Sequence, residues 1–377
     1  MCTRGTAPLP AHFGTGALPG FSLASSSCMA NGKKPRVVVI TGASAGVGRA
    51  TVREFAKQGA HIGLIARGKD GLEAARREVE SAGGRALVLP TDVANADQVE
   101  AAAAAVEERL GPIDVWINDA MVSVFSPVKE MTAEEFKRVT EVTYLGYVYG
   151  TLSALKRMLP RDEGIIIQVG SALAYRGIPC QAAYCASKHA IQGFCDSLRT
   201  ELLHDKSKVR LTMIQMPALN TPQFTWVKSR LPRKPQPVPP IFQPEVAAEA
   251  IAWAADHDRR EIYVGWPTVK AIVGNKIAPG FADHYLANMG YDAQQYDGHA
   301  DPNRPNNLWE PLPGDFGAHG DFDDRAQPYS RELWTTLHKR WIALAAGLGL
   351  AGLAAWWKGG AAAQWWNGGA AAGGRAA

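Results

Sequence analysis

A short apolar run, a glycine-rich turn and a helical pattern follow one another at residues 36–58. The run at residues 36–40 reads RVVVI, and the turn at residues 41–48 reads TGASAGVG, with glycine spacing G-x-x-x-G-x-G. A strand, bare backbone and a helix N-terminus together can accept a dinucleotide phosphate. Such turns are also ordinary joints in α/β proteins, and the spacing differs from G-x-G-x-x-G, so the motif alone is weak. Strands alternate with helices up to about residue 267, which predicts an α/β fold with a Rossmann-like doubly wound parallel sheet in a single domain.

A hydroxyl, a phenol and an amine form the second pattern. Tyr184 follows Ser171 by thirteen residues, and Lys188 lies four residues further on, in the segment YCASK. The apolar spacing that follows predicts a helix, which places Tyr184 and Lys188 on one face. A free tyrosine titrates at about pH 10, and a neighbouring ammonium is expected to lower the pKa of Tyr184. Such a pair is commonly structural when it occurs alone, but together with the glycine turn it predicts a general acid/base.

On these motifs the chain resembles the short-chain dehydrogenases/reductases over about residues 35–270. The matching landmarks lie in the family's order and at roughly its spacing. The resemblance implies that Ser171, Tyr184 and Lys188 are catalytic and that Lys188 also holds the nicotinamide ribose. It further implies homo-oligomers, in which helices pair between subunits.

The same resemblance assigns cofactor contacts along the chain. Asp92 is expected to bind the adenine, and Asn118 to brace the central strand. Pro217 and Thr221 are expected to flank the nicotinamide. With Arg67, which is considered below, the expected cofactor-binding residues are Gly42, Ser44, Gly46, Val47, Gly48, Arg67, Asp92, Val93, Asn118, Ala120, Tyr184, Lys188, Pro217 and Thr221.

Three segments depart from the family's pattern. Thr143 stands where similar enzymes carry the asparagine that holds a proton-relay water, so Thr143 is included among the catalytic residues with an altered relay. The usual N-N-A-G reads NDAM at residues 118–121, and the usual P-G reads PA at residues 217–218. The last two changes are expected to crowd the nicotinamide side without removing a reacting group.

The end of the second expected strand favours NADP(H) over NAD(H). An acidic residue at this position would accept hydrogen bonds from the ribose hydroxyls of NAD, but here the strand ends at Ala66 and Arg67 follows. A guanidinium can bind the 2'-phosphate of NADP through a charge-assisted, bidentate contact. A solvated arginine at a helix start is the alternative.

The expected reaction is hydride transfer between NADP(H) and a carbonyl or secondary alcohol. In the reductive direction Tyr184 protonates the forming alkoxide, and Ser171 positions its oxygen. The substrate is expected to be an apolar small molecule. The rival hypothesis is a nucleotide-binding scaffold or redox sensor that has lost turnover, which the presence of Thr143 motivates.

Composition narrows the remaining classes of function. The net charge is +4 and no basic stripe alternates with aromatics, so nucleic-acid binding is not indicated. Five cysteines without a pattern indicate reduced thiols and a cytoplasmic setting. No His, Cys, Asp or Glu cluster has metal-ligand spacing, so no metal is expected.

Two further segments have unusual compositions, and with the ends of the chain they set the expected organisation. Residues 222–244 carry seven prolines and are expected either to cover the substrate or to form a solvated loop. Residues 341–357 form an uncharged run with tryptophan at both ends, which favours a membrane anchor over a docking helix or a disordered tail. The expected organisation is a disordered extension at 1–34, the catalytic domain at 35–289, a polar linker at 290–340, the anchor at 341–357 and a low-complexity tail at 358–377.

Overall fold

The computed structural model describes residues 34–301 and 303–339, together with positions 342, 344, 346–348, 350, 351 and 353. The described residues belong almost entirely to one compact unit that begins at Pro35. The expected extension at 1–34, apart from Lys34, and the expected tail at 358–377 lie outside the described residues.

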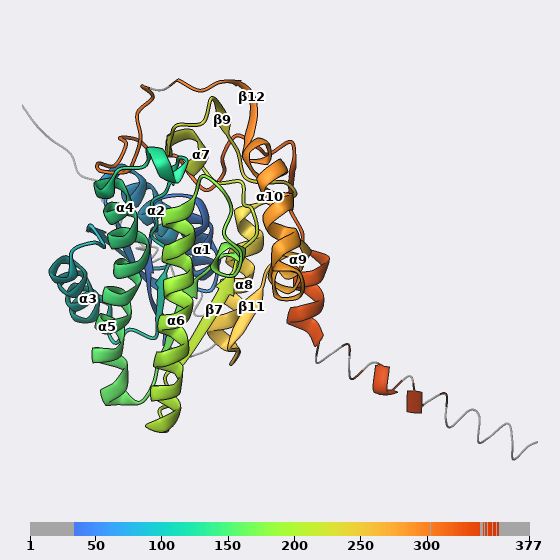
Figure 1. Cartoon of the computed structure of the whole chain (residues 1–377). Coiled ribbons are helices and arrows are strands. Elements are labelled where there is room, and N and C mark those ends of the chain that lie inside the picture. Colours follow the sequence, from blue (N-terminus) through green and yellow to red (C-terminus); the bar gives the residue numbers. More distant parts are fainter. Residues whose placement is uncertain are drawn as a thin grey trace, which may run out of the picture. The chain divides into compact units, whose positions relative to one another are not determined.

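A seven-stranded parallel sheet with strand order β11-β7-β6-β4-β1-β2-β3 forms the centre of this unit. This confirms the predicted doubly wound sheet. Figure 1 labels β7 and β11 of this sheet among the surrounding helices. The strands are β1 (Val37–Thr41), β2 (His61–Ala66), β3 (Ala86–Pro90), β4 (Val115–Asn118), β6 (Ile165–Val169), β7 (Arg210–Gln215) and β11 (Glu261–Tyr263).

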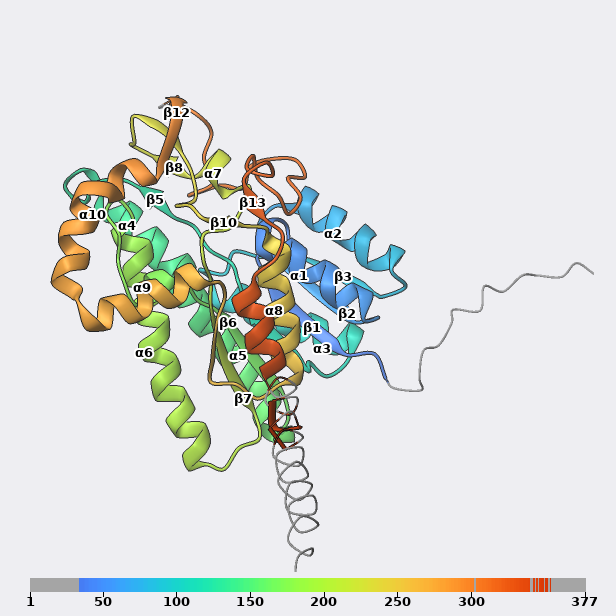
Figure 2. The ribbon, with the colours of Figure 1, turned by 90° about the vertical axis from the view of Figure 1, so that its right-hand side faces the viewer.

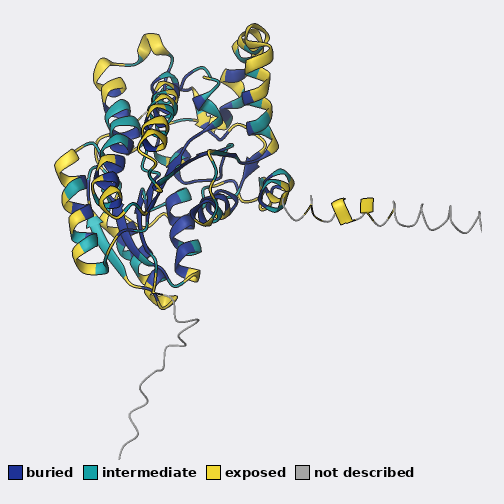
Figure 3. Ribbon diagram, turned by 90° about the horizontal axis from the view of Figure 1, so that it is seen from below, coloured by how far each residue is buried: buried dark blue, intermediate teal, exposed yellow. Residues whose placement is uncertain are grey.

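Helices cover both faces of the sheet, and their apolar sides form two separate cores. Figure 3 shows the buried sheet between helices whose outer sides are exposed. One face is covered by α1 (Gly46–Lys57), α2 (Lys69–Ser81) and α8 (Pro244–Asp256). The other is covered by α3 (Ala96–Leu110), α5 (Gly146–Met158) and α6 (Ala182–His204), with α4 (Ala133–Thr140) preceding α5.

The central strands are mainly apolar because both of their faces are buried. All five residues of β1 are buried, and so are all five of β6. Val38 pairs with Ile62 of β2 on one side and with Val115 of β4 on the other. The chain therefore reverses its direction of winding between β1 and β4, and the crevice at the carboxyl ends of these strands is where such sheets bind ligands.

Two segments cover this edge. The first lies between β7 and α8 and contains the short helix α7 (Gln223–Trp226), and the second follows β11 and contains the paired helices α9 (Trp266–Ile277) and α10 (Pro279–Ala293). Three two-stranded ladders join these segments to each other and to the sheet domain. They are β5 (Val124–Phe125) with β8 (Lys228–Ser229), β9 (Arg233–Pro235) with β12 (Gln295–His299), and β10 (Ile241–Phe242) with β13 (Ala326–Gln327).

The expectation of a polar linker at residues 290–340 is wrong, because these residues pack on the rest of the domain. The first of these residues complete α10, and the remainder, residues 295–301 and 303–339, packs on the sheet domain; we call it the strap (Figure 2). Leu308 is fully buried in one core, and Leu333 and Leu337 of the helix at 331–339 are buried in the other. A few apolar anchors along a polar sequence hold the strap. Leu333 and Leu337 have helical spacing, but Leu308 lies 25 residues earlier with no periodic pattern between them.

The membrane-anchoring helix expected at 341–357 lies mostly outside the described residues. No helix in the described part of the chain is both long and apolar enough to cross a membrane.

Candidate active site

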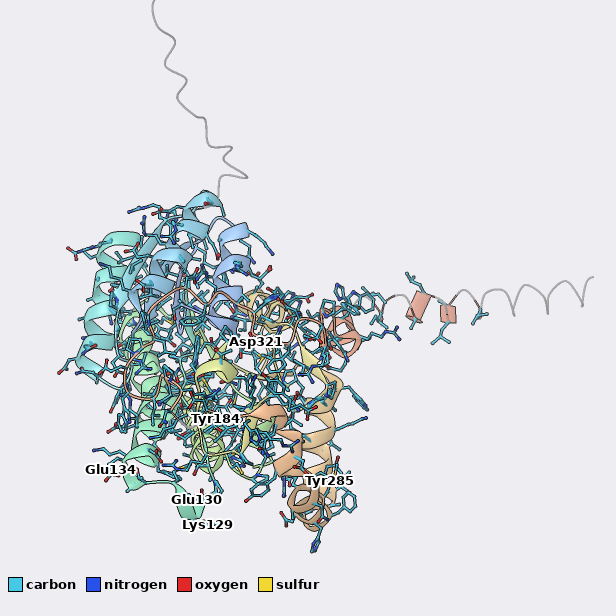
Figure 4. All side chains as sticks on the ribbon, turned by 90° about the horizontal axis from the view of Figure 1, so that it is seen from above. Lys129, Glu130, Glu134, Tyr184, Tyr285 and Asp321 are labelled. Carbon is cyan, nitrogen blue, oxygen red and sulfur yellow. The ribbon has the colours of Figure 1, made fainter. Side chains whose placement is uncertain are left out.

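A cavity of about 500 Å³ lies at the carboxyl edge of the sheet. It brings together most of the residues singled out in the sequence. In the view of Figure 4, Tyr184 lies towards the middle of the domain, with Tyr285 of α10 and Glu134 of α4 further out. The predicted site residues that line the cavity are Gly42, Ser44, Gly46, Val47, Arg67, Asp92, Val93, Ala120, Ser171, Tyr184, Lys188, Pro217 and Thr221.

The glycine turn between β1 and α1 fits a dinucleotide phosphate. Gly46 has φ +58°, a left-handed conformation that favours glycine. Gly48 does not line the cavity, but a Cβ on it would lie 2.2 Å from the carbonyl oxygen of Gly42, so no other residue fits. Ala45 at the N-cap makes no side-chain cap. The backbone N–H of Gly46 donates to the carbonyl oxygen of Gly317 and that of Gly48 to the Asp119 carboxylate, which leaves fewer amides of this turn for an anion.

Ser171, Tyr184 and Lys188 meet at the same end of the sheet. Ser171 follows β6, and its backbone N–H donates to the side-chain oxygen of Gln215 on β7, 2.7 Å away. Tyr184 and Lys188 lie one turn apart on α6, as the spacing predicts. The hydroxyl of Ser171 acts on that of Tyr184, since it lowers the pKa of the phenol. This arrangement presents two hydroxyl groups to one substrate oxygen.

The pKa of Tyr184 is raised, which corrects the expectation that Lys188 lowers it. Burial raises the pKa of Tyr184 well above its usual value, and the hydrogen bond from Ser171 opposes this only in part. The Nζ atom of Lys188 lies 5.5 Å from the centre of the Tyr184 ring and is bonded elsewhere. At neutral pH Tyr184 is therefore a protonated phenol, the form that donates a proton.

Lys188 is 2% exposed, and its ammonium group faces three partners. It donates to the hydroxyl of Tyr147 at 3.0 Å and to the carbonyl oxygen of Val169 at 2.6 Å. Burial lowers the pKa of Lys188, and the negative charge of Asp119 opposes that shift. In turn, burial raises the pKa of Asp119, and Lys188 opposes that shift. Asp119, which departs from the family's asparagine, thus acts on the lysine through its charge, without a direct ion pair between the two side chains.

Thr143 does not line the cavity. It lies in a π-helical turn, Glu141–Leu145, between α4 and α5. Its hydroxyl accepts from the backbone N–H of Val122 at 3.1 Å and donates to the Val122 carbonyl at 2.8 Å. Because both bonding directions are used on the backbone, the side chain fixes the segment after β4 and does not face the reacting groups.

Asn118 also lies outside the cavity, in a buried network below it. Its amide donates to the side-chain oxygen of Gln168 on β6 at 3.0 Å and accepts from the Trp116 indole at 2.9 Å. It also reaches the Thr151 hydroxyl of α5 at 3.2 Å. These contacts join β4 to β6 and α5, which is the bracing that the sequence predicts for Asn118.

Asp92 lines the cavity after β3, but its carboxylate has a protein partner. Arg138 of α4 donates to it at 2.6 Å. The same guanidinium donates to the carbonyl oxygen of Leu308 in the strap at 3.1 Å. The expected adenine contact therefore falls at a point where the sheet, α4 and the strap meet.

Arg67 also contacts the strap. Its guanidinium donates to the carbonyl oxygens of Asn307 and Trp309, at 2.5 Å and 2.7 Å. Burial lowers the pKa of Arg67, and the positive charge of Arg138 adds to this shift. The solvated arginine considered as the alternative is excluded, because this side chain is held in the wall of the cavity.

A profile of the short chain dehydrogenase family matches residues 36–230. The chain belongs to this family. The oxidoreductase YxnA of Bacillus subtilis is 32% identical over 325 residues, which cover 86% of this chain and 90% of that protein. As that alignment is much longer than residues 36–230, the similarity extends beyond the minimal family fold.

Two solved structures of this family align with the sheet domain. Levodione reductase has a TM-score of 0.54 and 26% identity, covering 62% of this chain and 98% of its own. An alcohol dehydrogenase from Thermococcus sibiricus, complexed with 5-hydroxy-NADP, has a TM-score of 0.53 and 27% identity. The alignment covers 61% of this chain and 96% of that one. The chain is therefore a nucleotide-binding oxidoreductase of the short-chain dehydrogenase family.

The sequence analysis did not identify several residues that shape the site. Tyr147 lies four residues after Thr143, and only this helical spacing could have indicated that it shares a face with Thr143. Gln215, which holds the backbone at Ser171, had no signal beyond its place at the end of a strand. The strap carries no motif at all.

Proposed function

We propose that the protein transfers hydride between NADP(H) and the carbonyl or secondary alcohol group of an apolar small molecule. The observation that carries this proposal is the convergence of the glycine turn, Ser171, Tyr184 and Lys188 on a single cavity. A nicotinamide cofactor bound there would supply or accept the hydride. The chain's own residues then have to position the substrate oxygen and move its proton.

The state of Tyr184 favours reduction. Because burial keeps its phenol protonated at neutral pH, it can give a proton to the oxygen of a carbonyl group as that oxygen gains negative charge. The Ser171 hydroxyl has a single proton, which would turn from the phenol oxygen to the substrate oxygen and give it a second hydrogen bond. A charged Lys188 nearby stabilises the phenolate that remains. Oxidation of an alcohol uses the same groups in reverse.

The preference for NADP(H) rests on the end of β2. No acidic residue stands there, and Arg67 lines the cavity where the 2'-phosphate would lie. The Thermococcus sibiricus relative is complexed with an NADP derivative, which supports the same preference. The bonds from Arg67 to the strap leave this guanidinium within the wall, so the phosphate would share it with those carbonyl groups.

The walls of the cavity support an apolar substrate. Phe125 and Phe224 pack edge to face with ring centres 6.1 Å apart, and both line the cavity. Trp226, Val238 and Leu286 line it as well. Burying apolar surface against such walls stabilises binding by roughly 25 cal/mol per Å².

A panel of aldehydes and ketones tests the proposal. The purified full-length protein is incubated with each compound and NADPH, and the loss of NADPH absorbance is followed. We expect compound-dependent oxidation with at least one apolar carbonyl and none with Tyr184→Phe. Tight NADPH binding without oxidation across the panel, and without reduction of NADP by the corresponding alcohols, would favour the nucleotide-binding scaffold instead.

A further inference from the structure

The only side chain that bonds to the Lys188 ammonium, among those the structure describes, is Tyr147 of α5. Tyr147 is 1% exposed, and its hydroxyl lies 3.0 Å from Nζ of Lys188. The same hydroxyl donates to the carbonyl oxygen of Val169 at 3.0 Å, and Lys188 donates to that oxygen at 2.6 Å. Three groups from α5, β6 and α6 therefore form a closed triangle of hydrogen bonds.

The directions of these bonds are fixed by the donors available. An ammonium only donates, so the Tyr147 oxygen must accept from Lys188, and its own proton goes to Val169. Its donor is therefore used on the backbone, and Tyr147 does not pass protons onward. Nζ of Lys188 also lies 4.6 Å from the centre of the Tyr147 ring, within the range of a cation–π contact.

We propose that Tyr147 is a positioning residue, which holds the Lys188 ammonium beside Tyr184 and keeps it charged during the reaction. This deepens the proposed function and rests on it. Thr143 cannot do this, because its hydroxyl is bonded to Val122 in both directions. Without the phenol oxygen, the lysine would keep a single backbone acceptor in a buried site.

The charge balance around Lys188 gives the sign of the effect. The titratable groups that face it are Asp119 after β4, Tyr184 on α6 and Tyr147 on α5, and Cys195 lies near Tyr147. Burial and the charge of Asp119 act on the lysine in opposite directions. The oxygen of Tyr147 accepts a stronger hydrogen bond from the charged ammonium than from a neutral amine, so it raises the lysine pKa, and its removal lowers that pKa.

Tyr147→Phe tests the proposal, because phenylalanine keeps the buried ring and removes only the hydroxyl. The first measurement is the pKa of Lys188 by NMR of protein with ¹³C-labelled lysine, with the signal assigned by its loss in Lys188→Met. We expect the pKa in Tyr147→Phe to be lower by about one unit, since a hydrogen bond to a charged group is worth about 1.5–3 kcal/mol. This readout requires no turnover.

The second measurement is the pH profile of kcat/KM for a carbonyl substrate found in the panel. The decline of activity as the lysine loses its proton should begin about one pH unit lower in Tyr147→Phe, giving roughly tenfold lower kcat/KM on the alkaline side. Tyr149→Phe, on the same helix but outside the triangle, is the matched control and should leave both measurements unchanged.

The two measurements separate the failure of this inference from the failure of the proposed function. If the wild type reduces no carbonyl, the proposed function fails, while the NMR measurement still decides whether Tyr147 sets the lysine's charge. An unchanged lysine pKa in Tyr147→Phe, with NADPH binding intact as a check of folding, would overturn the inference. A shift of equal size in Tyr149→Phe would also overturn it.

Discussion

Strands β1 and β2 lie side by side because two apolar runs pair in parallel over five consecutive residues, from Val37 with His61 to Thr41 with Ile65. The strap reaches the same edge of the sheet in a different way. Arg67 and Arg138 hold its backbone carbonyls, and Arg49 bonds Asp315 at 3.0 Å. The sheet is thus held by regular hydrogen bonds and two continuous apolar cores, whereas the strap is held by separate polar contacts and a few buried anchors.

This difference explains how one cavity combines two kinds of wall. The sheet side presents the glycine turn and the proposed catalytic residues on rigid elements, as positioning of a reaction requires. The strap side presents Asn307, Pro311 and Phe316, and Phe316 packs edge to face on Trp226 at 4.7 Å. The backbone N–H of Gly46 donates to the carbonyl oxygen of Gly317 at 3.0 Å, so the strap contacts the glycine turn directly. Changes in the sheet side should therefore alter chemistry, and changes in the strap should alter stability and cofactor binding.

Tyr184→Phe should have the largest effect. It removes the proton donor and leaves the sheet and the strap intact, so kcat should fall by about 10²–10⁴-fold while NADPH affinity stays within a few-fold of wild type. Steady-state kinetics and NADPH fluorescence titration measure the two quantities. A variant that keeps its activity would show that the reacting proton does not come from this phenol.

Leu308→Ala compares an anchor of the strap with the core of the sheet. A fully buried leucine costs about 2–5 kcal/mol of unfolding free energy when it is cut to alanine. We expect a smaller loss than for Ile167→Ala in β6, because the strap can detach while the sheet stays folded. Urea unfolding measures the stability, and limited proteolysis at residues 303–323 reports detachment. Equal losses for both variants, without faster cleavage, would show that the strap unfolds together with the sheet.

Arg67→Ala separates the two roles of this guanidinium. If Arg67 also binds the 2'-phosphate, the dissociation constant for NADPH should rise about tenfold or more, and that for NADH much less. Equal weakening for both cofactors would mean that Arg67 acts only through the strap. Arg77→Ala, an exposed arginine on α2, is the matched control.

Asp315→Asn should have the smallest effect. The Asp315 side chain is 41% exposed, and Arg49 keeps its contact with Glu78 at 2.8 Å after the change. We expect a loss below about 1 kcal/mol, seen as a small drop in melting temperature. Glu78→Gln should cost more, because Glu78 also bonds Arg53 at 3.0 Å. The reverse order would indicate that the strap depends mainly on this single ion pair.

The parts of the site that the sequence predicted are those with a local signal. Gly46 and Gly48 are read from a turn between a strand and a helix, and Tyr184 and Lys188 from helical spacing. The expectation that failed depends on a contact between residues far apart in the chain. The four-residue spacing of Tyr184 and Lys188 predicted a lower pKa for Tyr184, but the Lys188 ammonium bonds the hydroxyl of Tyr147, 41 residues earlier in the chain.

The sequence by itself determined the doubly wound sheet and pointed to the proposed catalytic groups, because apolar periodicity, glycine turns and helical spacing act over a few residues. The tertiary structure decided where the charges point. Arg67 meets carbonyl groups more than 240 residues later, and Arg138 joins Asp92 to Leu308. Such contacts depend on how distant segments pack, so the charge state of the site and the covering of the cofactor edge follow from the fold.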